Sequence, residues 1–406
     1  MKKIAITLSR KAINYNNIFT NGIHQNIYTL QKILRETGMY DIHLFYDYTV
    51  HTKPFEDGTY VYRYESKEQL EDIALLEQEK YVLHERYPHF DVDNVHHRNA
   101  TTREEQNILQ DFDLVIEAGY AYDFINLNKI KKINPNIKIA FLAYGNMYFG
   151  ALEKLIFPSN GATIPYCEGR DAVWLSPHFE EWLEWHKTLL KTPIADIAPY
   201  VWSPEFFEKK LNDKFSLTRD TFTVADNKNV AVLEPNIGFV KTCVTPAVII
   251  ENLYDRVPST LDGAYIFNAK HFLDSDAAKS MFTKMKVVKD GIMSFEPRRG
   301  LEEIFTKYCS VLLSHQHCCA LNYVFLEALY LNIPMVHNSP FFKEVGYYYE
   351  GFDVSAASSQ LEKALENKHL DKVNGERTEE FLWKYSPENP NNINGYIKLI
   401  EDILTK

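Results

Sequence analysis

The feature that most constrains the fold is an alternation of short apolar runs with segments of helical periodicity. Residues 3–8 form one apolar run, residues 27–34 carry apolar side chains at helical spacing, and residues 42–46 form the next run. Strands joined through a helix form a βαβ unit, in which the two strands are parallel. The opening of the chain therefore predicts a parallel α/β sheet, with Gly38 at the end of the first helix.

The same alternation continues to the end of the chain. Further strands are expected at residues 113–118, 138–142, 230–233, 264–267, 285–288, 309–313 and 334–336, and helices at about 177–192, 243–254, 275–284, 301–308, 322–331, 357–367 and 393–405. A Pro-containing connector and a charged segment separate two βα series, which places a domain boundary between residues 199 and 228. We expect two doubly wound α/β domains, residues 1–205 and 206–385, which face each other across a cleft that holds the site. A helix within residues 386–406 is expected to pack back on the first domain.

The composition excludes several classes of protein. Hydrophobic residues make up 45% and charged residues 24% of the 406 residues, as in ordinary globular proteins. The net charge of −11 excludes a generally basic nucleic-acid binder, although a local basic face stays open. The aromatic content of 14% is high enough to supply stacking surfaces for sugars or bases.

The start of the chain and its cysteines indicate a cytoplasmic protein. The apolar run at residues 4–8 is too short for a signal-peptide core, and no run of 18 apolar residues predicts a membrane span. The cysteines are Cys167, Cys243, Cys309, Cys318 and Cys319. An odd and sparse set of this kind is typical of reduced thiols rather than of a disulfide framework.

The stretch that most favours a ligand site is residues 310–353. A polar loop, residues 314–322, leads from a strand into the N-terminus of a helix, where unpaired N–H groups and the positive end of the helix dipole attract anions. Asn322 begins this helix, and Glu327 lies about one turn inside it, where a carboxylate is placed to accept hydrogen bonds from two hydroxyls, as of a ribose. The alternative interpretation is that Glu327 is a solvated helix residue.

A second strand-to-helix loop, residues 233–242, carries the polar residues Asn236 and Lys241. Gly238 permits close backbone approach, and Lys241 offers a point charge for a phosphate. The loop lacks the glycine spacing of a P-loop or of a dinucleotide fingerprint. An ordinary βα turn is therefore the alternative.

The histidines and cysteines do not predict a metal centre. His315, His317, Cys318 and Cys319 lack a second pair of ligands at zinc-finger spacing, and His89, His96 and His97 are expected in a polar loop. We expect no bound metal and no permanent cofactor.

A general base, if the reaction needs one, is expected from the first domain. The candidates are His24, Glu117 and Asp123. Glu117 ends a buried strand, where open α/β sheets bind ligands, and strand-end capping is its alternative role. The acceptor side of the site is expected to include Asn21, Gly22, Tyr144 and Asn146, because they follow strands of the same domain.

Together these motifs resemble a family of proteins from bacteria and phages, DUF2827. The resemblance is carried by residues 21–26, by residues 234–237 with Lys241 and Thr242, and by residues 314–340, and it continues through residues 346–354. It spans nearly the whole chain. That family is similar to GT-B glycosyltransferases, which have two Rossmann-like domains, with a nucleotide-sugar donor on the second and an acceptor on the first.

The resemblance implies roles for several residues. It implies that Glu327 binds the donor ribose and that Asn322, with its helix N-terminus, lies near the diphosphate. Asn236 and Lys241 fall at the other phosphate-binding loop, and residues 265–268, which include Phe267 and Asn268, are placed to meet the nucleobase. GT-B enzymes need no metal, because the helix dipole and basic side chains stabilise the leaving diphosphate. The sequence has no clear paired Arg/Lys signature of the large retaining families. Arg298 with Arg299 is the candidate for it, and both retention and inversion are compatible with the resemblance.

The function that follows is transfer of a sugar from a nucleotide-sugar, expected to be a UDP-sugar, to a hydroxyl acceptor. Some family members resemble phage enzymes that add arabinose or glucose to 5-hydroxymethylcytosine in DNA, and this resemblance implies duplex DNA with that base as the acceptor. Lysines that could contact DNA gather at Lys129, Lys131, Lys132 and Lys138 and at Lys209, Lys210 and Lys214, although the net charge favours a merely solvated face. The alternatives are a cell-surface glycan as acceptor and a non-catalytic nucleotide- or sugar-binding protein of the same fold. The sugar and the oligomeric state stay open.

Overall fold

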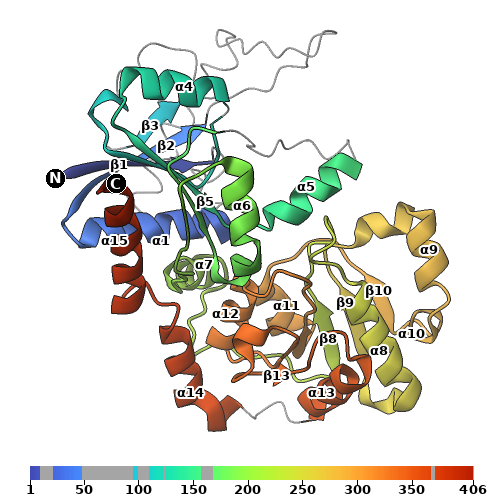
Figure 1. Ribbon diagram of the computed structural model, residues 1–406. Helices are drawn as coiled ribbons and strands as arrows, with labels where there is room; N and C mark the ends of the chain where they lie inside the picture. The colour runs from blue at the N-terminus through green and yellow to red at the C-terminus, as the bar shows by residue number, and fades with distance from the viewer. Residues whose placement is uncertain are drawn as a thin grey trace, which may run out of the picture. The chain divides into compact units, whose positions relative to one another are not determined.

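The computed structural model describes residues 1–9, 22–47, 95–98, 109–122, 124–156, 168–366 and 371–405. The chain divides into two compact units (Figure 1). Unit 1 comprises Met1–Met147, Ala162–Trp202 and Tyr385–Lys406, and unit 2 comprises Tyr148–Gly161 and Ser203–Lys384.

Unit 1 is built on a seven-stranded parallel sheet with the strand order β3-β2-β1-β4-β5-β6-β7. Its strands are β1 (Lys2–Leu8), β2 (Tyr40–Asp47), β3 (Val95–Arg98), β4 (Leu114–Glu117), β5 (Lys138–Ala143), β6 (Ala172–Leu175) and β7 (Ile194–Ile197). Its helices are α1 (Gly22–Glu36), η3 (Leu109–Asp111), α4 (Phe124–Ile133), η4 (Pro177–Trp182), α6 (Leu183–Leu190) and α15 (Pro390–Leu404). Ile4 and Ile6 of β1 and Ile116 of β4 are fully buried, as in strands that are covered on both faces.

The carboxyl ends of β1 and β4 approach each other closely at Gly119. A Cβ atom on Gly119 would lie 2.5 Å from the backbone nitrogen of Ser9, so the position requires glycine. The hydroxyl of Thr7 accepts from the N–H of Ala118 at 2.9 Å and donates to the carbonyl of Tyr120 at 2.7 Å. These contacts fix the turn that follows β4.

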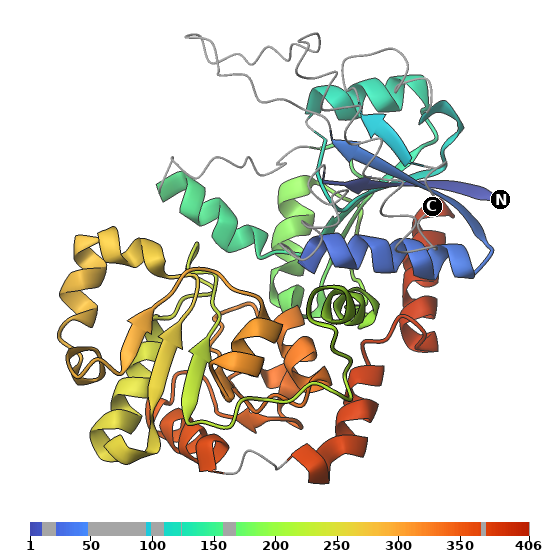
Figure 2. The ribbon, with the colours of Figure 1, turned by 180° about the vertical axis from the view of Figure 1, so that it is seen from behind.

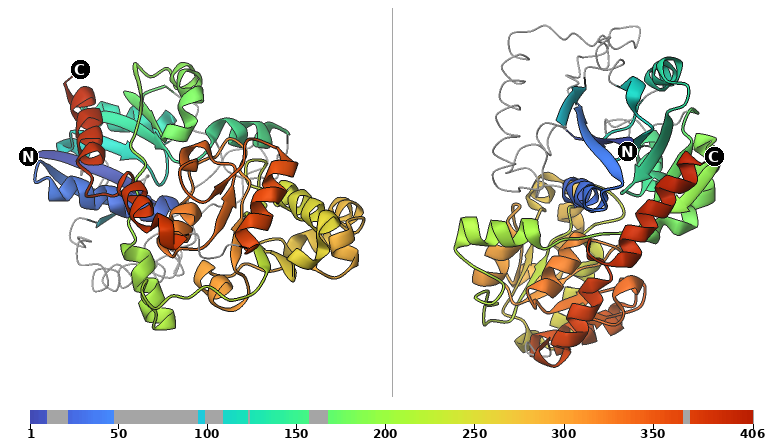
Figure 3. Two further views of the ribbon diagram at one scale, coloured as in Figure 1. Left: turned by 90° about the horizontal axis from the view of Figure 1, so that it is seen from below. Right: turned by 90° about the vertical axis from the view of Figure 1, so that its left-hand side faces the viewer.

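The C-terminal helix α15 belongs to unit 1, so both chain ends lie in this unit (Figure 3). The hydroxyl of Tyr396 donates to the carbonyl of Pro199 at 2.7 Å, and the hydroxyl of Tyr40 donates to the Glu401 carboxylate at 2.8 Å. Gly395 lies against the Pro199 ring, where a Cβ atom would be 2.6 Å from Cγ. The helix is thereby joined to segments that are far away in the sequence.

Unit 2 is built on a six-stranded parallel sheet with the strand order β10-β9-β8-β11-β12-β13 (Figure 2). Its strands are β8 (Asn229–Val232), β9 (Gly263–Ile266), β10 (Met293–Phe295), β11 (Val311–Leu313), β12 (Met335–His337) and β13 (Tyr347–Tyr348). Its helices are α5 (Met147–Ile156), α7 (Glu205–Phe215), α8 (Val244–Arg256), η5 (Pro258–Thr260), η6 (Lys270–Asp274), α9 (Asp276–Phe282), α10 (Lys286–Lys289), α11 (Leu301–Lys307), α12 (Tyr323–Tyr330), η7 (Pro340–Phe342), α13 (Val354–Glu366) and α14 (Asp371–Trp383). The chain runs from β8 to β9 and β10 on one side and then returns to β11 on the other. The topological switch point of the sheet therefore lies between β8 and β11.

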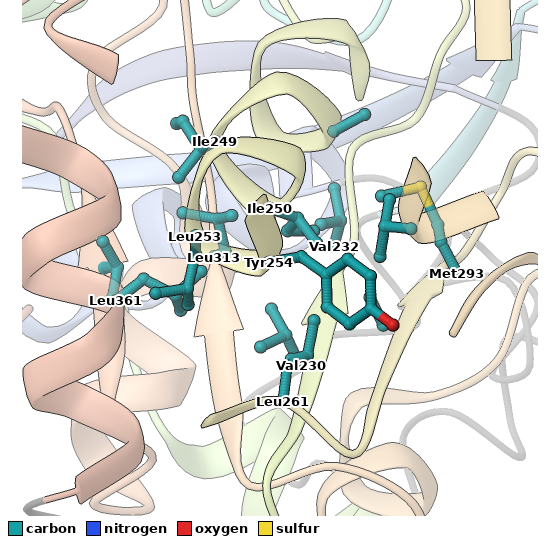
Figure 4. Packing of buried hydrophobic residues seen from close by; sticks show 14 of the residues in the cluster. Val230, Val232, Ile249, Ile250, Leu253, Tyr254, Leu261, Met293, Leu313 and Leu361 are labelled. Atoms are coloured by element: carbon teal, nitrogen blue, oxygen red, sulfur yellow. The ribbon is translucent and has the colours of Figure 1, made fainter. Parts of the chain in front are cut away.

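Helices α8 and α13 cover one face of this sheet. Figure 4 shows apolar side chains of both helices around the strands, and the cluster includes Val230, Val232, Ile250, Leu253, Leu313 and Leu361. Most of these residues have no exposed surface. Each such buried side chain stabilises the fold by about 1.5–3 kcal/mol relative to its exposed state. This packing fixes the strands whose carboxyl ends form the site.

The prediction of two doubly wound parallel domains is confirmed, while their arrangement around a common cleft stays a prediction. Three element predictions are wrong. His96 and His97 lie in strand β3 and not in a polar loop. Helix α1 begins at Gly22, whereas a loop was expected up to residue 26. Residues 286–289 form helix α10 instead of a strand, because the Glu251 carboxylate accepts from the N–H groups of Lys286 at 2.7 Å and Val287 at 2.9 Å and so caps the helix start.

In the described part of the chain, none of the helices is both long and apolar enough to cross a membrane.

Candidate functional site

The polar groups of unit 2 gather in two loops at its switch point. One loop follows β8 and the other follows β11, so both leave the carboxyl edge of the sheet on neighbouring strands. Open α/β sheets bind their ligands at this position. The two loops expected from the sequence therefore lie side by side.

The β8 loop is held in shape by Asn236. This residue has a φ of +57°, and its side-chain nitrogen donates to the carbonyl of Glu234 at 2.8 Å. Its Oδ1 accepts from the N–H of Cys243 at 2.7 Å, and its own N–H donates to the carbonyl of Lys241 at 3.1 Å. Since these bonds use its amide within the loop, Asn236 shapes the loop instead of offering that amide to a ligand.

The two loops are joined at the buried carboxylate of Glu234. The hydroxyl of Ser314 and the backbone N–H of His315 both donate to it. Further out, the N–H of His317 donates to the carbonyl of Val240 at 2.9 Å. Burial raises the pKa of Glu234 to about 7, against the opposing effects of Ser314 and of the Lys241 ammonium.

His315 is a buried histidine with one ring nitrogen unused. Its Nδ1 lies 2.9 Å from the hydroxyl of Tyr349. Its Nε2 is buried and has no hydrogen-bond partner within the described ranges. Burial, with a contribution from His317, lowers the pKa of His315 to about 4, so the ring is neutral at pH 7.

Gln316, next along the same loop, has a buried side-chain amide that is unused at both ends. The side chain of Asn338 binds the backbone of Gln316 twice. The N–H of Gln316 donates to Oδ1 of Asn338 at 3.0 Å, and the carbonyl of Gln316 accepts from Nδ2 of Asn338 at 3.0 Å. Its side-chain oxygen and nitrogen are buried without a partner among the described residues. A buried polar group in this state costs about 1–3 kcal/mol of stability. Such a group at a switch point is typical of a ligand contact.

Helix α12 brings two predicted residues to the same loop. Asn322 is its N-cap, and the Asn322 side chain accepts from the N–H of Val324 at 3.4 Å. Glu327 is partly exposed, and desolvation by the surrounding protein raises the pKa of its carboxyl group to about 7. Lys210 of α7 lowers this pKa and Glu302 of α11 raises it. Within the residues that the structure describes, the Glu327 carboxylate has no hydrogen-bond partner, so it is not the fully solvated group of the alternative interpretation.

The remaining residues predicted for the donor side follow β8 and β9. Lys241 is half-buried in the β8 loop. Phe267 is buried and stacks on Tyr265 with ring centroids 6.4 Å apart. Asn268 has a φ of +57° and donates from Nδ2 to the carbonyl of Leu233 at 3.0 Å, while its buried Oδ1 has no partner in the described part of the chain. These residues extend the polar edge from β11 past β8 to β9.

His337, in contrast, is a structural residue of the core. Its Nε2 donates to the carbonyl of Val345 at 2.9 Å, and its Nδ1 accepts from the N–H of Ser339 at 3.2 Å. Burial lowers its pKa to about 4. Gly346 packs against this ring with a φ of +69°, and a Cβ atom there would lie 3.2 Å from Nε2.

The structure argues against Glu117 as a general base. The residue is fully buried, and Arg170 binds it through Nε at 2.5 Å and Nη2 at 3.1 Å. The N–H of Tyr122 also donates to Glu117, at 2.6 Å. Both carboxylate oxygens therefore serve strand-end capping and a buried ion pair, which is the alternative role.

The other candidates in unit 1 are placed as follows. His24 is buried near the start of α1, and Gly22 is the first residue of that helix. Tyr144 follows β5, and its hydroxyl lies within hydrogen-bonding reach of Tyr396. Asn146 is partly exposed in the same loop. Asn21 and Asp123 lie outside the described residues, as do His89 and Cys167.

Where the structure describes them, the other charged and metal-binding candidates do not form a second site. Within the described ranges no three His, Cys, Asp or Glu residues are grouped to hold a metal ion. Arg299 donates to Glu303 at 2.9 Å on the surface. Among the lysines considered for DNA binding, Lys131 pairs with Asp171 at 2.6 Å and Lys210 pairs with Glu302 at 2.9 Å.

Sequence reasoning missed Glu234, Gln316 and the buried Nε2 of His315, which has no partner among the described residues. Glu234 directly follows an apolar strand, and that position was a signal that could have found it. Nothing in the sequence distinguishes the Gln316 amide from a solvated one, because its burial depends on neighbours from β12.

Comparison with known proteins gives a family and remote structural likenesses. A family model described as "Protein of unknown function (DUF2827)" matches residues 59–400. No curated protein matches the chain.

Three solved structures are examples of remote similarity to this chain. The pneumococcal O-GlcNAc transferase GtfA, in complex with UDP and GlcNAc, is similar at 11% identity and a TM-score of 0.43. The match covers 72% of this chain and 57% of GtfA, so this chain spans little more than half the length of GtfA. The Thermobaculum terrenum O-GlcNAc transferase is similar at 9% identity and a TM-score of 0.48, over 99% of this chain and 68% of that one. The UDP-GlcNAc 2-epimerase from Neisseria meningitidis, bound to UDP-GlcNAc, is similar at 13% identity and a TM-score of 0.39, over 100% of both chains.

Proposed function

The chain belongs to the DUF2827 family, and from its site we propose that it is a GT-B-type glycosyltransferase. The proposed reaction moves a sugar from a nucleotide-sugar donor to a hydroxyl acceptor, and the preferred donor is a UDP-sugar. The observation that carries the proposal is the Glu327 carboxylate, which lies one turn inside α12, is partly desolvated, and has no hydrogen-bond partner in the described part of the chain. A carboxylate accepts hydrogen bonds only, and the two hydroxyls of a ribose can supply them. Ligand hydroxyls would stabilise the ionised form and so lower the raised pKa.

Neighbouring groups suit the rest of such a donor. The N-terminus of α12 and the Lys241 ammonium favour a diphosphate, and they would stabilise the charge that develops on it as the sugar leaves. The Gln316 amide offers both a donor and an acceptor to sugar hydroxyls. The Asn268 oxygen is available to a nucleobase N–H near Phe267.

Ligand binding by the wild-type chain and Glu327→Ala tests the donor site. Saturation with UDP at 100 times Kd should stabilise the wild-type fold by about 2.7 kcal/mol, visible as a thermal shift that GDP, ADP and CMP do not match. We expect Glu327→Ala to weaken UDP binding at least about tenfold in calorimetry, because the ribose hydroxyls lose a charged partner. Glu344→Gln, a surface carboxylate of the same unit, is the matched control. Equal UDP affinity of Glu327→Ala and the wild type would refute the donor site.

For proton removal from the acceptor we propose His24, since Glu117 is committed to Arg170. A positioned general base contributes about 10²–10⁴-fold to rate. We therefore expect His24→Asn to lower transfer at least about a hundredfold while UDP affinity is unchanged. Retained transfer would exclude His24 from the chemistry.

The acceptor is identified by transfer assays that follow UDP release together with sugar incorporation. Duplex DNA with 5-hydroxymethylcytosine is compared with plain cytosine DNA and with glycan acceptors. Incorporation into the modified DNA alone would support the DNA acceptor that the family resemblance suggests. Binding of UDP-sugar without transfer to any acceptor class would favour the non-catalytic alternative.

A further inference from the structure

Helix α5 places a carboxylate on the β8 loop of unit 2. Tyr148–Gly161 belongs to unit 2, and Glu153 of α5 accepts a hydrogen bond from the backbone N–H of Phe239 at 2.6 Å. This is a short, charge-assisted bond. The loop in question is the one that carries Lys241.

Gly238 allows this carboxylate to lie directly against the backbone. A Cβ atom on Gly238 would be 2.9 Å from Oε1 and 3.2 Å from Oε2 of Glu153. Both oxygens therefore lie over the Gly238–Phe239 peptide. The absence of a side chain at Gly238 makes room for an anion there.

The same helix also contacts the β11 loop. The ring of Phe149 lies 5.8 Å from the ring of His317, whose N–H bonds the carbonyl of Val240. Helix α5 thus contacts both loops of the switch point. Its contacts there are an aromatic pair and an anion on a backbone N–H.

We infer that the Phe239 N–H beside Gly238 is an anion-binding site for a phosphate group of the donor, and that Glu153 occupies it as an internal substitute. This inference rests on the proposed function for the identity of the ligand. A phosphate and the Glu153 carboxylate cannot both bind the same N–H at the same face of Gly238, and their like charges repel. Donor binding consequently requires that Glu153 withdraws, so α5 restrains the site until a phosphate displaces it.

The test compares Kd values for UDP and for inorganic pyrophosphate, measured by calorimetry on the wild-type chain and three variants. Glu153→Gln removes the charge, and Glu153→Asp keeps the charge but shortens the side chain so that it retreats from Phe239. Asp276→Asn is the control: it removes one negative charge, as Glu153→Gln does, but on the exposed helix α9, far from Glu153 in the sequence. We expect both Glu153 variants to bind UDP more tightly than the wild type, Glu153→Gln by about tenfold, and Asp276→Asn to bind as the wild type does.

The outcomes separate this inference from the proposed function. Unchanged UDP affinity in both Glu153 variants, with clear binding by the wild type, would overturn the inference and leave the function standing. Tighter pyrophosphate binding by Glu153→Gln without any UDP binding would support the anion site and count against a UDP donor. Failure of every variant to bind either anion would overturn both.

Discussion

The hydroxyl of Ser314 donates a hydrogen bond to the carboxylate of Glu234, and this contact joins the loop after β11 to the loop after β8. Glu234 is only 2% exposed, and the N–H of His315 is its second donor. The two loops that carry the candidate site are thus held in register by one buried acidic group.

This acidic group makes stability depend on pH. Burial raises the pKa of Glu234 in the folded chain to about 7 from the ordinary 4.5, so the folded chain binds its proton more tightly than the unfolded chain. The resulting stabilisation is fully present below about pH 4.5 and is lost as the pH rises through about 7. Glu234→Gln keeps a carbonyl for Ser314 and His315 but cannot ionise, and should remove a pH-dependent contribution of roughly 3 kcal/mol. Chemical unfolding of the wild type and of Glu234→Gln between pH 4.5 and 8 measures this contribution. If the free energy of unfolding of the two proteins changed with pH in the same way, the raised pKa of Glu234 would be contradicted.

The Gln316 amide is predicted to reduce stability in the ligand-free chain and to bind the ligand. Replacing it by an apolar side chain of similar length removes two buried polar atoms that have no partner in the described part of the chain. Gln316→Met should therefore raise the free energy of unfolding by about 1–2 kcal/mol while weakening UDP-sugar binding. Gln360→Met, on α13, is the control for the same substitution outside the site. A loss of stability in Gln316→Met would indicate a structural role instead.

Asn236 is expected to act on the loop and not on a ligand. Asn236→Ala leaves the N–H of Cys243 without an acceptor and forces an alanine to a φ of +57°, which should cost about 3 kcal/mol of stability. Asn236→Gly tolerates that φ but still loses the hydrogen bonds, so its loss should be smaller. Thermal and chemical unfolding distinguish the two variants. If Asn236→Ala lost UDP affinity with full stability, the side chain would be a ligand contact.

Glu117 is expected to matter for stability rather than for chemistry. Glu117→Gln leaves the Arg170 guanidinium buried without its counter-charge, which typically costs about 3–5 kcal/mol. Glu168→Gln removes one partner of an exposed pair in the same unit and should cost less than about 1 kcal/mol. Transfer per folded molecule should be retained by both variants. A folded but inactive Glu117→Gln would restore the carboxylate to the mechanism.

The parallel sheets could be predicted because their strands are short apolar runs that are buried on both faces. Strands β1, β8 and β11 all follow that pattern. Strands β6 and β7 were not expected, since a Trp-rich stretch and a Pro-rich connector hide them in the sequence. Helix α7 was interpreted as a charged connector, although Phe206 and Phe207 are buried within it.

The candidate site could be predicted as two loops and one carboxylate, but not as a network. Loop position follows from the order of strands and helices, and this placed Lys241, Asn322 and Glu327 beside the switch point, while their roles stay predictions. The roles of Glu234 and Gln316 depend on burial by residues from other strands, such as Asn338 after β12. The burial of Glu117 by Arg170 likewise joins positions that are 53 residues apart, which no local pattern reveals.

The return of the chain to unit 1 after unit 2 sets an order for folding during synthesis. Ser203–Lys384 emerges from the ribosome before Tyr385–Lys406, so the six-stranded sheet has its contiguous sequence complete while unit 1 still lacks α15. Until α15 has been made, Tyr40 has no Glu401 and Pro199 has no Tyr396 to bond. Most of unit 1 is therefore made before unit 2, yet its contacts with α15 can form only after the sequence of unit 2 has been made.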